Sequence, residues 1–212
     1  MKFDIISFDL QGTLSDAAFS DEFWLETLPK LNAKYKRISL KKSKELLKNE
    51  FKKYGKYDSR YYSVKYWMKE LEQNLSFEDL QKKMRNKPVF FDDTLGLIKT
   101  LQKKAKLIII SSTTRDFIDV ELGEHKTYFD EVYSSLDDFN IAGKPKEIYL
   151  KIANIMKTNP ARILHIGDNY EMDIENANEA GFKTFYFDRS KPRTRLIEDL
   201  KKRINDRRAY ST

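Results

Sequence analysis

Short apolar runs alternate with segments of helical period in the first 14 residues of the chain and again from residue 90 to its end. The apolar runs have the length of buried strands and lie at residues 3–8, 107–110, 163–166 and 184–187. Apolar side chains recur at helical spacing at residues 95–101, 148–156, 174–180 and 194–208. Strand and helix in alternation predict an α/β fold with a parallel sheet covered on both faces.

Residues 15–89 show a different pattern, with amphipathic helices in succession and no strand candidate between them. The predicted helices lie at residues 19–35, 40–54, 61–75 and 77–84. Gly55 interrupts the series, and Lys87 with Pro88 marks the return to the alternating pattern. We therefore predict a doubly wound, Rossmann-like core formed by residues 1–14 and 90–212, with an all-helical cap, residues 15–89, inserted after the first strand.

Positive charge is concentrated in this predicted cap. The whole chain has a net charge of +7, and residues 15–89 contain 18 Lys and Arg against 11 Asp and Glu, so the rest is balanced. Six of the 12 tyrosines also lie there, interleaved with lysines, a pattern seen in proteins that bind single-stranded nucleic acid. Amphipathic helices with buried aromatic faces and solvated lysines give the same pattern. We expect a small anionic substrate under the cap rather than a nucleic acid.

The composition restricts the kinds of site that the chain can form. It has no cysteine and only two histidines, which excludes disulfides, thiolate nucleophiles and Cys-built zinc sites and disfavours a His-rich metal centre. A metal here must be bound by oxygen atoms, which favours Mg²⁺. The sequence contains no secretory signal and no long apolar run. We therefore expect a cytoplasmic protein, a monomer or homodimer, without membrane contact.

Three polar residues follow the predicted strand ends, where doubly wound sheets bind their ligands, and a fourth lies just before the helix that leads to the strand at residues 163–166. They are Asp9, Ser111, Lys144 and Asp168. Taken singly, each is explained as a helix N-cap or a solvated lysine. Taken together, a carboxylate nucleophile, a hydroxyl, an ammonium and an acidic cluster have the components of a phosphoryl-transfer site.

The acidic segment at residues 167–173 supports this interpretation. Asp168 and Asp173 bracket about one helical turn and can bring two carboxylates to a cation shared with Asp9. Such a cation screens the repulsion between a carboxylate nucleophile and a phosphate. Ser111 and the backbone N–H groups after it can bind phosphate oxygens, while Lys144 neutralises their charge.

These residues lie in four motifs whose order resembles that of the haloacid dehalogenase-like superfamily. The motifs are FDLQGTL at residues 8–14, IIISS at 108–112, GKP at 143–145 and GDNYEMD at 167–173. The resemblance extends along almost the whole chain, and residues 15–89 lie where this family inserts its helical C1-type cap. It implies a phosphatase-branch enzyme with a lid that closes over the active site.

The resemblance also implies a role for each motif residue. Asp9 is the nucleophile, Ser111 and Ser112 bind the phosphate, Lys144 steadies nucleophile and phosphate, and Thr13 positions the nucleophile loop. The implied Mg²⁺ ligands are Asp9, the backbone carbonyl of Gln11, Asp168 and Asp173.

Gln11 departs from the family pattern. The phosphatases have Asp two positions after the nucleophile, where it protonates the leaving alcohol and then activates the hydrolytic water. An amide cannot exchange a proton near neutral pH, so we expect general acid–base catalysis worth about 10²–10⁴-fold to be missing. A substrate with a good leaving group, a change made to trap a complex, and a binding protein without turnover each account for this substitution.

The sequence therefore predicts a phosphohydrolase that acts on a small phosphorylated metabolite through an aspartyl-phosphate intermediate with Mg²⁺, its acid–base catalysis weakened at Gln11. A non-catalytic protein that binds a phosphorylated ligand is an alternative. A haloacid dehalogenase is a further alternative, although Asp168 and Asp173 argue against it because dehalogenation needs no Mg²⁺.

Overall fold

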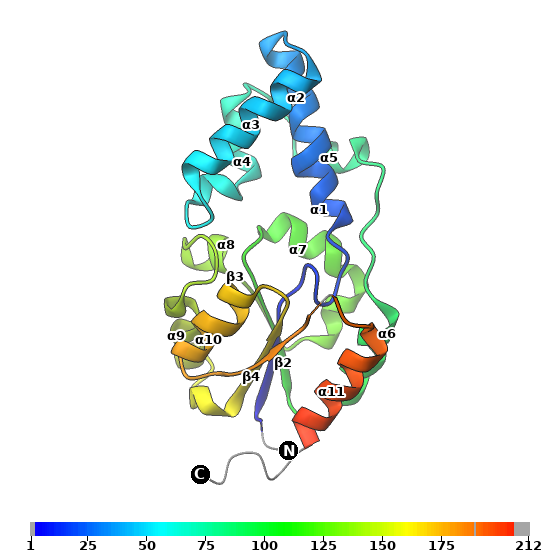
Figure 1. The fold of residues 1–212 in the computed structure, drawn as a ribbon, viewed down its shortest axis with the longest axis vertical. Coiled ribbons are helices and arrows are strands. Elements are labelled where there is room, and N and C mark those ends of the chain that lie inside the picture. The colour runs from blue at the N-terminus through cyan, green and yellow to red at the C-terminus, as the bar shows by residue number, and fades with distance from the viewer. Residues whose placement is uncertain (1–2, 189, 206–212) are drawn as a thin grey trace.

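The computed structural model describes residues 3–188 and 190–205, and its centre is a five-stranded parallel sheet (Figure 1). The strands are β1 (Ile5–Phe8), β2 (Lys106–Ser111), β3 (Glu131–Ser134), β4 (Ile163–Gly167) and β5 (Lys183–Tyr186). They are ordered β3-β2-β1-β4-β5, which places β1 in the middle. In register, Phe8 of β1 lies opposite Ile109 of β2 and Ile166 of β4.

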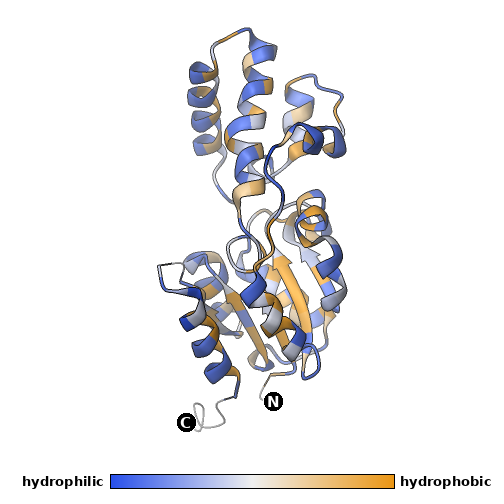
Figure 2. Cartoon of the chain, turned by 90° about the vertical axis from the view of Figure 1, so that its right-hand side faces the viewer, coloured by the Kyte–Doolittle hydropathy of each residue, from blue (hydrophilic) through white to orange (hydrophobic). Residues whose placement is uncertain are grey.

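Helices cover both faces of the sheet because successive strand residues point in opposite directions. In β1, Ile6 and Phe8 face a core shared with α6 (Asp92–Leu101), α7 (Arg115–Leu122) and α11 (Arg193–Asn205). Ile5 faces the other core, with α9 (Lys146–Ile155) and α10 (Asn176–Glu179). Figure 2 shows orange, hydrophobic strands at the centre of the core. The predicted doubly wound α/β fold is confirmed.

Some elements differ from the sequence prediction. The strand β3, the helix α7 and the short helix α8 (Ser135–Phe139) were not predicted. Residues 174–180, predicted as one helix, belong to a π-helical turn η5 (Tyr170–Glu175) followed by α10. The last helix, α11, ends at Asn205, and the predicted extension to residue 208 lies outside the described residues.

Between β1 and α6 the chain forms a helical insertion that lies beyond the carboxyl ends of the strands (Figure 1). Its elements are α1 (Ala18–Glu22), the π-helical turn η1 (Phe23–Thr27), α2 (Leu28–Lys36), α3 (Leu40–Tyr54), the 3₁₀ turn η2 (Ser59–Tyr61), α4 (Val64–Glu70) and α5 (Phe77–Lys83). They surround a hydrophobic cluster of their own, to which α7 of the core contributes Phe117.

Caps and turns set the ends of these helices. Ser39 accepts a hydrogen bond from the N–H of Lys42 at the start of α3, and Gly55 ends this helix at a φ of 71°. The helix α4 is shorter than the predicted segment 61–75, because Ser63 caps its start and the chain turns to a φ of 50° at Glu72. The helical spacing of apolar residues in the sequence thus continues past both ends of α4 into the turns beside it.

The insertion is joined to the core by two chain segments that lie side by side. Ser15 and Phe90 form an antiparallel bridge. The N–H of Asp16 donates to the carbonyl of Val89 at 2.8 Å, and the N–H of Phe91 donates to the carbonyl of Leu14 at 2.9 Å. The chain therefore leaves and re-enters the core at one place.

The remaining short elements connect helices to strands. The 3₁₀ turns η3 (Gly123–Tyr128) and η4 (Pro160–Arg162) precede β3 and β4. Across the described residues, no helix is both long enough and apolar enough to cross a bilayer.

Candidate active site

The candidate site lies where the strand order reverses. From β1 the chain proceeds through β2 to β3 on one side, and it then crosses to β4 and β5 on the other. The carboxyl ends of β1 and β4 therefore border a topological switch point, the usual ligand position in doubly wound sheets. Asp9 directly follows β1, and Asp168 directly follows β4.

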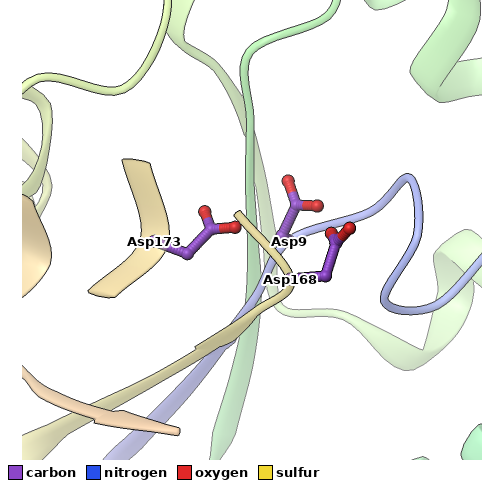
Figure 3. A group of neighbouring side chains, drawn as sticks. All are labelled: Asp9, Asp168 and Asp173. Atoms are coloured by element: carbon purple, nitrogen blue, oxygen red, sulfur yellow. The ribbon is translucent and has the colours of Figure 1, made fainter. Parts of the chain in front are cut away.

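Three carboxylates meet at this point (Figure 3). One carboxylate oxygen from each of Asp9, Asp168 and Asp173 lies within 4.8 Å of the others. Asp9 and Asp173 are buried, and Asp168 is half-buried. Burial of like charges at this separation is costly unless cations balance them, so the cluster requires positive charge nearby.

Lys144 supplies part of that charge. Only 2% of this residue is exposed, and its Nζ donates to Asp9 Oδ1 at 2.6 Å and also pairs with Asp173 Oδ1. Burial by itself would lower the pKa of Lys144, but the carboxylates of Asp173 and Asp9 raise it well above the ordinary value. The ammonium therefore stays protonated and fixes the nucleophile predicted at Asp9.

The two buried carboxyls that share Lys144 differ in their protonation behaviour. Burial raises the pKa of Asp9 well above its usual range, and Lys144 opposes this effect. Burial also acts to raise the pKa of Asp173, but Lys144 and His165 outweigh it, so the pKa of Asp173 is lowered. Asp173 is thus the more acidic of the two carboxyls and serves as a counter-ion of Lys144.

The hydrogen bonds of Asp173 leave it little capacity for a metal. Its Oδ1 contacts Lys144 and lies 3.2 Å from His165 Nε2, while Oδ2 accepts the N–H of Asn169 at 2.9 Å. A carboxylate has about four acceptor positions, of which these contacts use three. Asp9 and Asp168 are therefore better placed as direct ligands of a divalent cation, and the all-oxygen donor set fits Mg²⁺.

The backbone at the end of β4 is adapted to this packing. Asn169 caps the π-helical turn η5 by accepting the N–H of Met172 at 3.0 Å, and this turn brings Asp173 back over the strand end. A Cβ on Gly167 would lie 2.3 Å from Asp173 Cγ, so a side chain there would displace the carboxylate. Glycine at this position is required by the acidic cluster.

A buried network of polar side chains adjoins Asp173 of the acidic cluster. This network was not predicted from the sequence. His165 Nδ1 lies 2.8 Å from Ser7 Oγ, and the Tyr149 hydroxyl, which donates to the carbonyl of Met172, lies 3.2 Å from His165 Nε2. Burial lowers the pKa of His165, which keeps the imidazole neutral. The available sequence signal was a histidine inside the otherwise apolar run ILHIG.

The loop after β1 carries Gln11 and Thr13. Gly12 adopts a φ of 87°, and the N–H groups of Leu14 and Ser15 donate to the carbonyl of Leu10, which forms a tight turn. The Thr13 hydroxyl donates to Asp168 Oδ1 at 3.3 Å. Thr13 therefore links the β1 loop to the acidic segment after β4.

Gln11 is bound to a carboxyl that the sequence analysis did not identify. Its Nε2 donates to Glu121 Oε1 at 2.6 Å, and Ser15 Oγ donates to Glu121 Oε2 at 2.9 Å. Glu121 is only 2% exposed, and burial raises its pKa to about 7 although both hydrogen bonds lower it. A glutamate on the apolar face of α7, four residues after Phe117, was the available sequence signal.

The raised pKa of Glu121 predicts a pH dependence of stability. Its carboxyl is more easily protonated in the folded than in the unfolded chain, so its stabilising effect is complete below about pH 4 and is lost as the pH rises through 7. Above pH 7 the loss amounts to about 3 kcal/mol. Denaturant unfolding of wild type and Glu121→Gln from pH 5 to 8.5 measures it. The variant should lack this slope, and identical slopes would contradict the prediction.

The predicted phosphate-binding serines lie at the carboxyl end of the neighbouring strand β2. Ser111 ends β2 and is 2% exposed, and its Oγ accepts the N–H of Thr113 at 3.3 Å. Ser112 is half-buried and lines a cavity together with Gln11 and Thr113. The structure thus brings the loops after β1 and β2 to one cavity.

A loop of the helical insertion reaches across to the core. The Tyr57 hydroxyl donates to Glu171 Oε1 at 2.7 Å, and Lys56 forms an ion pair with the same carboxylate. Asn176 Nδ2 donates to the carbonyl of Lys144 at 2.9 Å and lies 3.4 Å from the Tyr57 hydroxyl. The insertion is thereby held against the segment that carries Lys144.

A family comparison agrees with this arrangement. The model of the haloacid dehalogenase-like hydrolases matches residues 3–181. The chain therefore belongs to the haloacid dehalogenase-like hydrolase family. No match was found among curated proteins.

Solved structures share the fold over nearly the whole chain. A haloacid dehalogenase-like phosphatase from Thermococcus onnurineus is 21% identical with a TM-score of 0.81, covering 96% of this chain and 98% of that one. A predicted phosphoglycolate phosphatase from Haemophilus somnus is 16% identical, with a TM-score of 0.62 and coverage of 96% and 99%. A family enzyme from Bacteroides thetaiotaomicron, in complex with magnesium and inorganic phosphate, is 15% identical, with a TM-score of 0.64 and coverage of 92% and 98%.

Proposed function

We propose that the chain is a Mg²⁺-dependent phosphohydrolase of the C1-capped phosphatase branch, acting on a small phosphorylated metabolite through an aspartyl phosphate on Asp9. The observation that carries this proposal is the buried cluster of Asp9, Asp168 and Asp173 around Lys144 at the switch point of the sheet. The magnesium and phosphate bound by the Bacteroides enzyme, a structure of the same fold, support it.

Asp9, Asp168 and the backbone carbonyl of Gln11 would hold the Mg²⁺, and Asp173 would contribute its one remaining acceptor position or bind through water. The cation, when bound, would oppose the effect of burial on the pKa of Asp9 and favour its carboxylate form. It would also lower the repulsion between this carboxylate and the negatively charged phosphate. The carboxylates fit this role because they are all-oxygen donors gathered within 4.8 Å.

In the first half-reaction, a carboxylate oxygen of Asp9 forms a bond to phosphorus while the bond from phosphorus to the leaving oxygen breaks. Lys144 holds Asp9 in place at 2.6 Å and balances the charge on the phosphate oxygens. Ser111, Ser112 and the N–H groups that follow bind those oxygens. Water then hydrolyses the phosphoaspartate. Gln11 cannot transfer protons in either step, so turnover of poor leaving groups is slow.

Residues 15–89 act as the cap in this proposal. Its loop at Lys56 and Tyr57 binds Glu171 of the acidic segment, which closes the site from the side of Lys144. A closed cap excludes bulk water from the reacting groups and strengthens their electrostatic interactions.

Phosphate release from acetyl phosphate and from simple alkyl phosphates tests this function. We expect hydrolysis of acetyl phosphate with Mg²⁺, loss of the activity on chelation with EDTA, and its recovery when Mg²⁺ is returned. Phosphate binding without release would instead identify a binding protein. Halide release from a 2-haloacid without Mg²⁺ would identify a dehalogenase.

A further inference from the structure

A cavity of about 280 Å³ lies between residues of the core and of the helical insertion, and Ser112 of the candidate phosphate site lines it. On the core side it is lined by Gln11, Ser112 and Thr113, which belong to the loops after β1 and β2. The cavity therefore adjoins a phosphate bound at these loops and offers space for the group attached to it.

Four aromatic rings form the walls on the side of the insertion. Trp24 comes from the π-helical turn η1, Phe51 from α3, and Tyr61 and Tyr62 from η2 and the residue after it. Their centroids form a continuous chain, with 5.9 Å between Trp24 and Phe51, 5.4 Å between Phe51 and Tyr61, and 4.9 Å between Tyr61 and Tyr62. Such edge and tilted contacts leave ring faces available for a further ring.

These rings are not simply core residues. All four are only partly buried, and Tyr61 and Tyr62 are not members of the hydrophobic cluster inside the insertion. Tyr61 and Tyr62 line the same cavity as Gln11 and Ser112. The aromatic wall and the loops after β1 and β2 thus border one space.

The charged residues of the cavity disfavour substrates that carry a second negative group near the phosphate. Among the described residues that line it there is one acid, Asp21, and no lysine or arginine. A more open groove adjoins the cavity and shares Trp24, Phe51 and Tyr61 with it. Its lining includes four lysines, Lys44, Lys48, Lys52 and Lys56, of which Lys44 pairs with Glu26 and Lys56 with Glu171. A carboxylate placed a few bonds from the phosphate, as in phosphoglycolate, would meet Asp21 and aromatic rings instead of a cation.

We propose that the substrate is a phosphomonoester whose leaving group carries a planar aromatic ring and no second negative charge near the phosphate. This inference rests on the proposed phosphohydrolase function and names its substrate class. The ring would stack on Trp24 and Tyr61 while the phosphate lies at Asp9.

Non-hydrolysable phosphonates test the proposal without requiring turnover. Calorimetry of the intact chain with Mg²⁺ would compare 2-phenylethylphosphonate, 2-cyclohexylethylphosphonate and 3-phosphonopropionate. The first two differ only in the aromaticity of a six-membered ring, and the third replaces the ring with a carboxylate. The phenyl compound should bind about 2- to 10-fold more tightly than the cyclohexyl compound. The carboxylate compound should bind about 10-fold more weakly than either.

Variants assign the preference to the aromatic wall. Trp24→Leu and Tyr61→Leu should each abolish the preference for phenyl over cyclohexyl, whereas Trp24→Phe should retain it. Tyr35→Leu is the matched control, because Tyr35 lies on α2 and does not line the cavity. Circular dichroism would verify that each variant is folded.

The outcomes separate this proposal from the proposed function. Equal binding of phenyl and cyclohexyl compounds, or a preference that survives both leucine variants, would overturn the substrate class. Acetyl phosphate hydrolysis without any phosphonate preference would overturn it and leave the hydrolase function standing. A phenyl preference without phosphate release from any ester would support the aromatic site and refute hydrolysis.

Discussion

Asp9→Asn is expected to reduce Mg²⁺-dependent phosphate release by about 10⁴-fold or more, because the amide cannot attack phosphorus or form the acyl phosphate. The fold should survive the substitution, since Lys144 keeps its second partner, Asp173. Steady-state phosphate release and trapping of the phosphorylated protein from labelled acetyl phosphate measure the effect. No labelled protein should form in the variant.

The control for this experiment is Asp199→Asn, the same chemical change on the outer helix α11. It should retain the wild-type rate. An Asp9→Asn protein that still hydrolyses acetyl phosphate within about 10-fold of the wild-type rate would show that Asp9 is not the nucleophile.

Gln11→Asp is expected to raise steady-state turnover of alkyl phosphates by about 10²–10⁴-fold, the usual contribution of a positioned acid and base. Attack by Asp9 on an acyl phosphate needs no proton from residue 11, so its phosphorylation step should change little. The aspartyl phosphate should accumulate in the wild-type protein and be depleted in the variant. Single-turnover and steady-state phosphate release distinguish the two steps.

The structure adds a condition to this prediction. Glu121 accepts the hydrogen bond from Gln11 in a buried position, and a new carboxylate at position 11 would lie near it. The double variant Gln11→Asp with Glu121→Gln should therefore gain more activity than Gln11→Asp alone, since the repulsion between two acids is removed. The experiment compares their rates on one alkyl ester.

Gln11→Asn is the matched control, because it has the length of aspartate and the amide of glutamine. It should give no gain. Fast hydrolysis of alkyl phosphates by the wild-type protein, unchanged in Gln11→Asp, would mean that another group supplies the proton and that position 11 is not the missing acid.

The sequence predicted the parallel sheet well because strands buried on both faces appear as continuous apolar runs. This holds for β1 and β4, which are buried throughout. β3 was not predicted, since it has four residues and begins with the exposed Glu131. Its pairing with β2 is a tertiary property that a local pattern does not contain.

Some residues of the candidate site could likewise be predicted from the sequence, whereas others depend on tertiary packing. Asp9 and Asp168 were predicted because strand ends of a parallel sheet lie on one edge, a rule that depends only on topology. The contact between Gln11 and Glu121 joins residues 110 positions apart and depends on how α7 packs against the loop after β1. The second role of Asp173, as counter-ion of Lys144 and partner of His165, likewise became visible only in three dimensions.

The paired segments at Ser15 and Phe90 bear on how such a protein can change during evolution. Because the two crossings are hydrogen-bonded neighbours, removing or exchanging the insertion leaves core ends that a short turn can join, at a small cost in loop-closure entropy. Inserted domains of different size can therefore be exchanged there while the carboxyl ends of β1 and β4 stay in place. The main adjustment falls on Phe117, whose ring is buried among insertion residues and would need a polar replacement in a core without them.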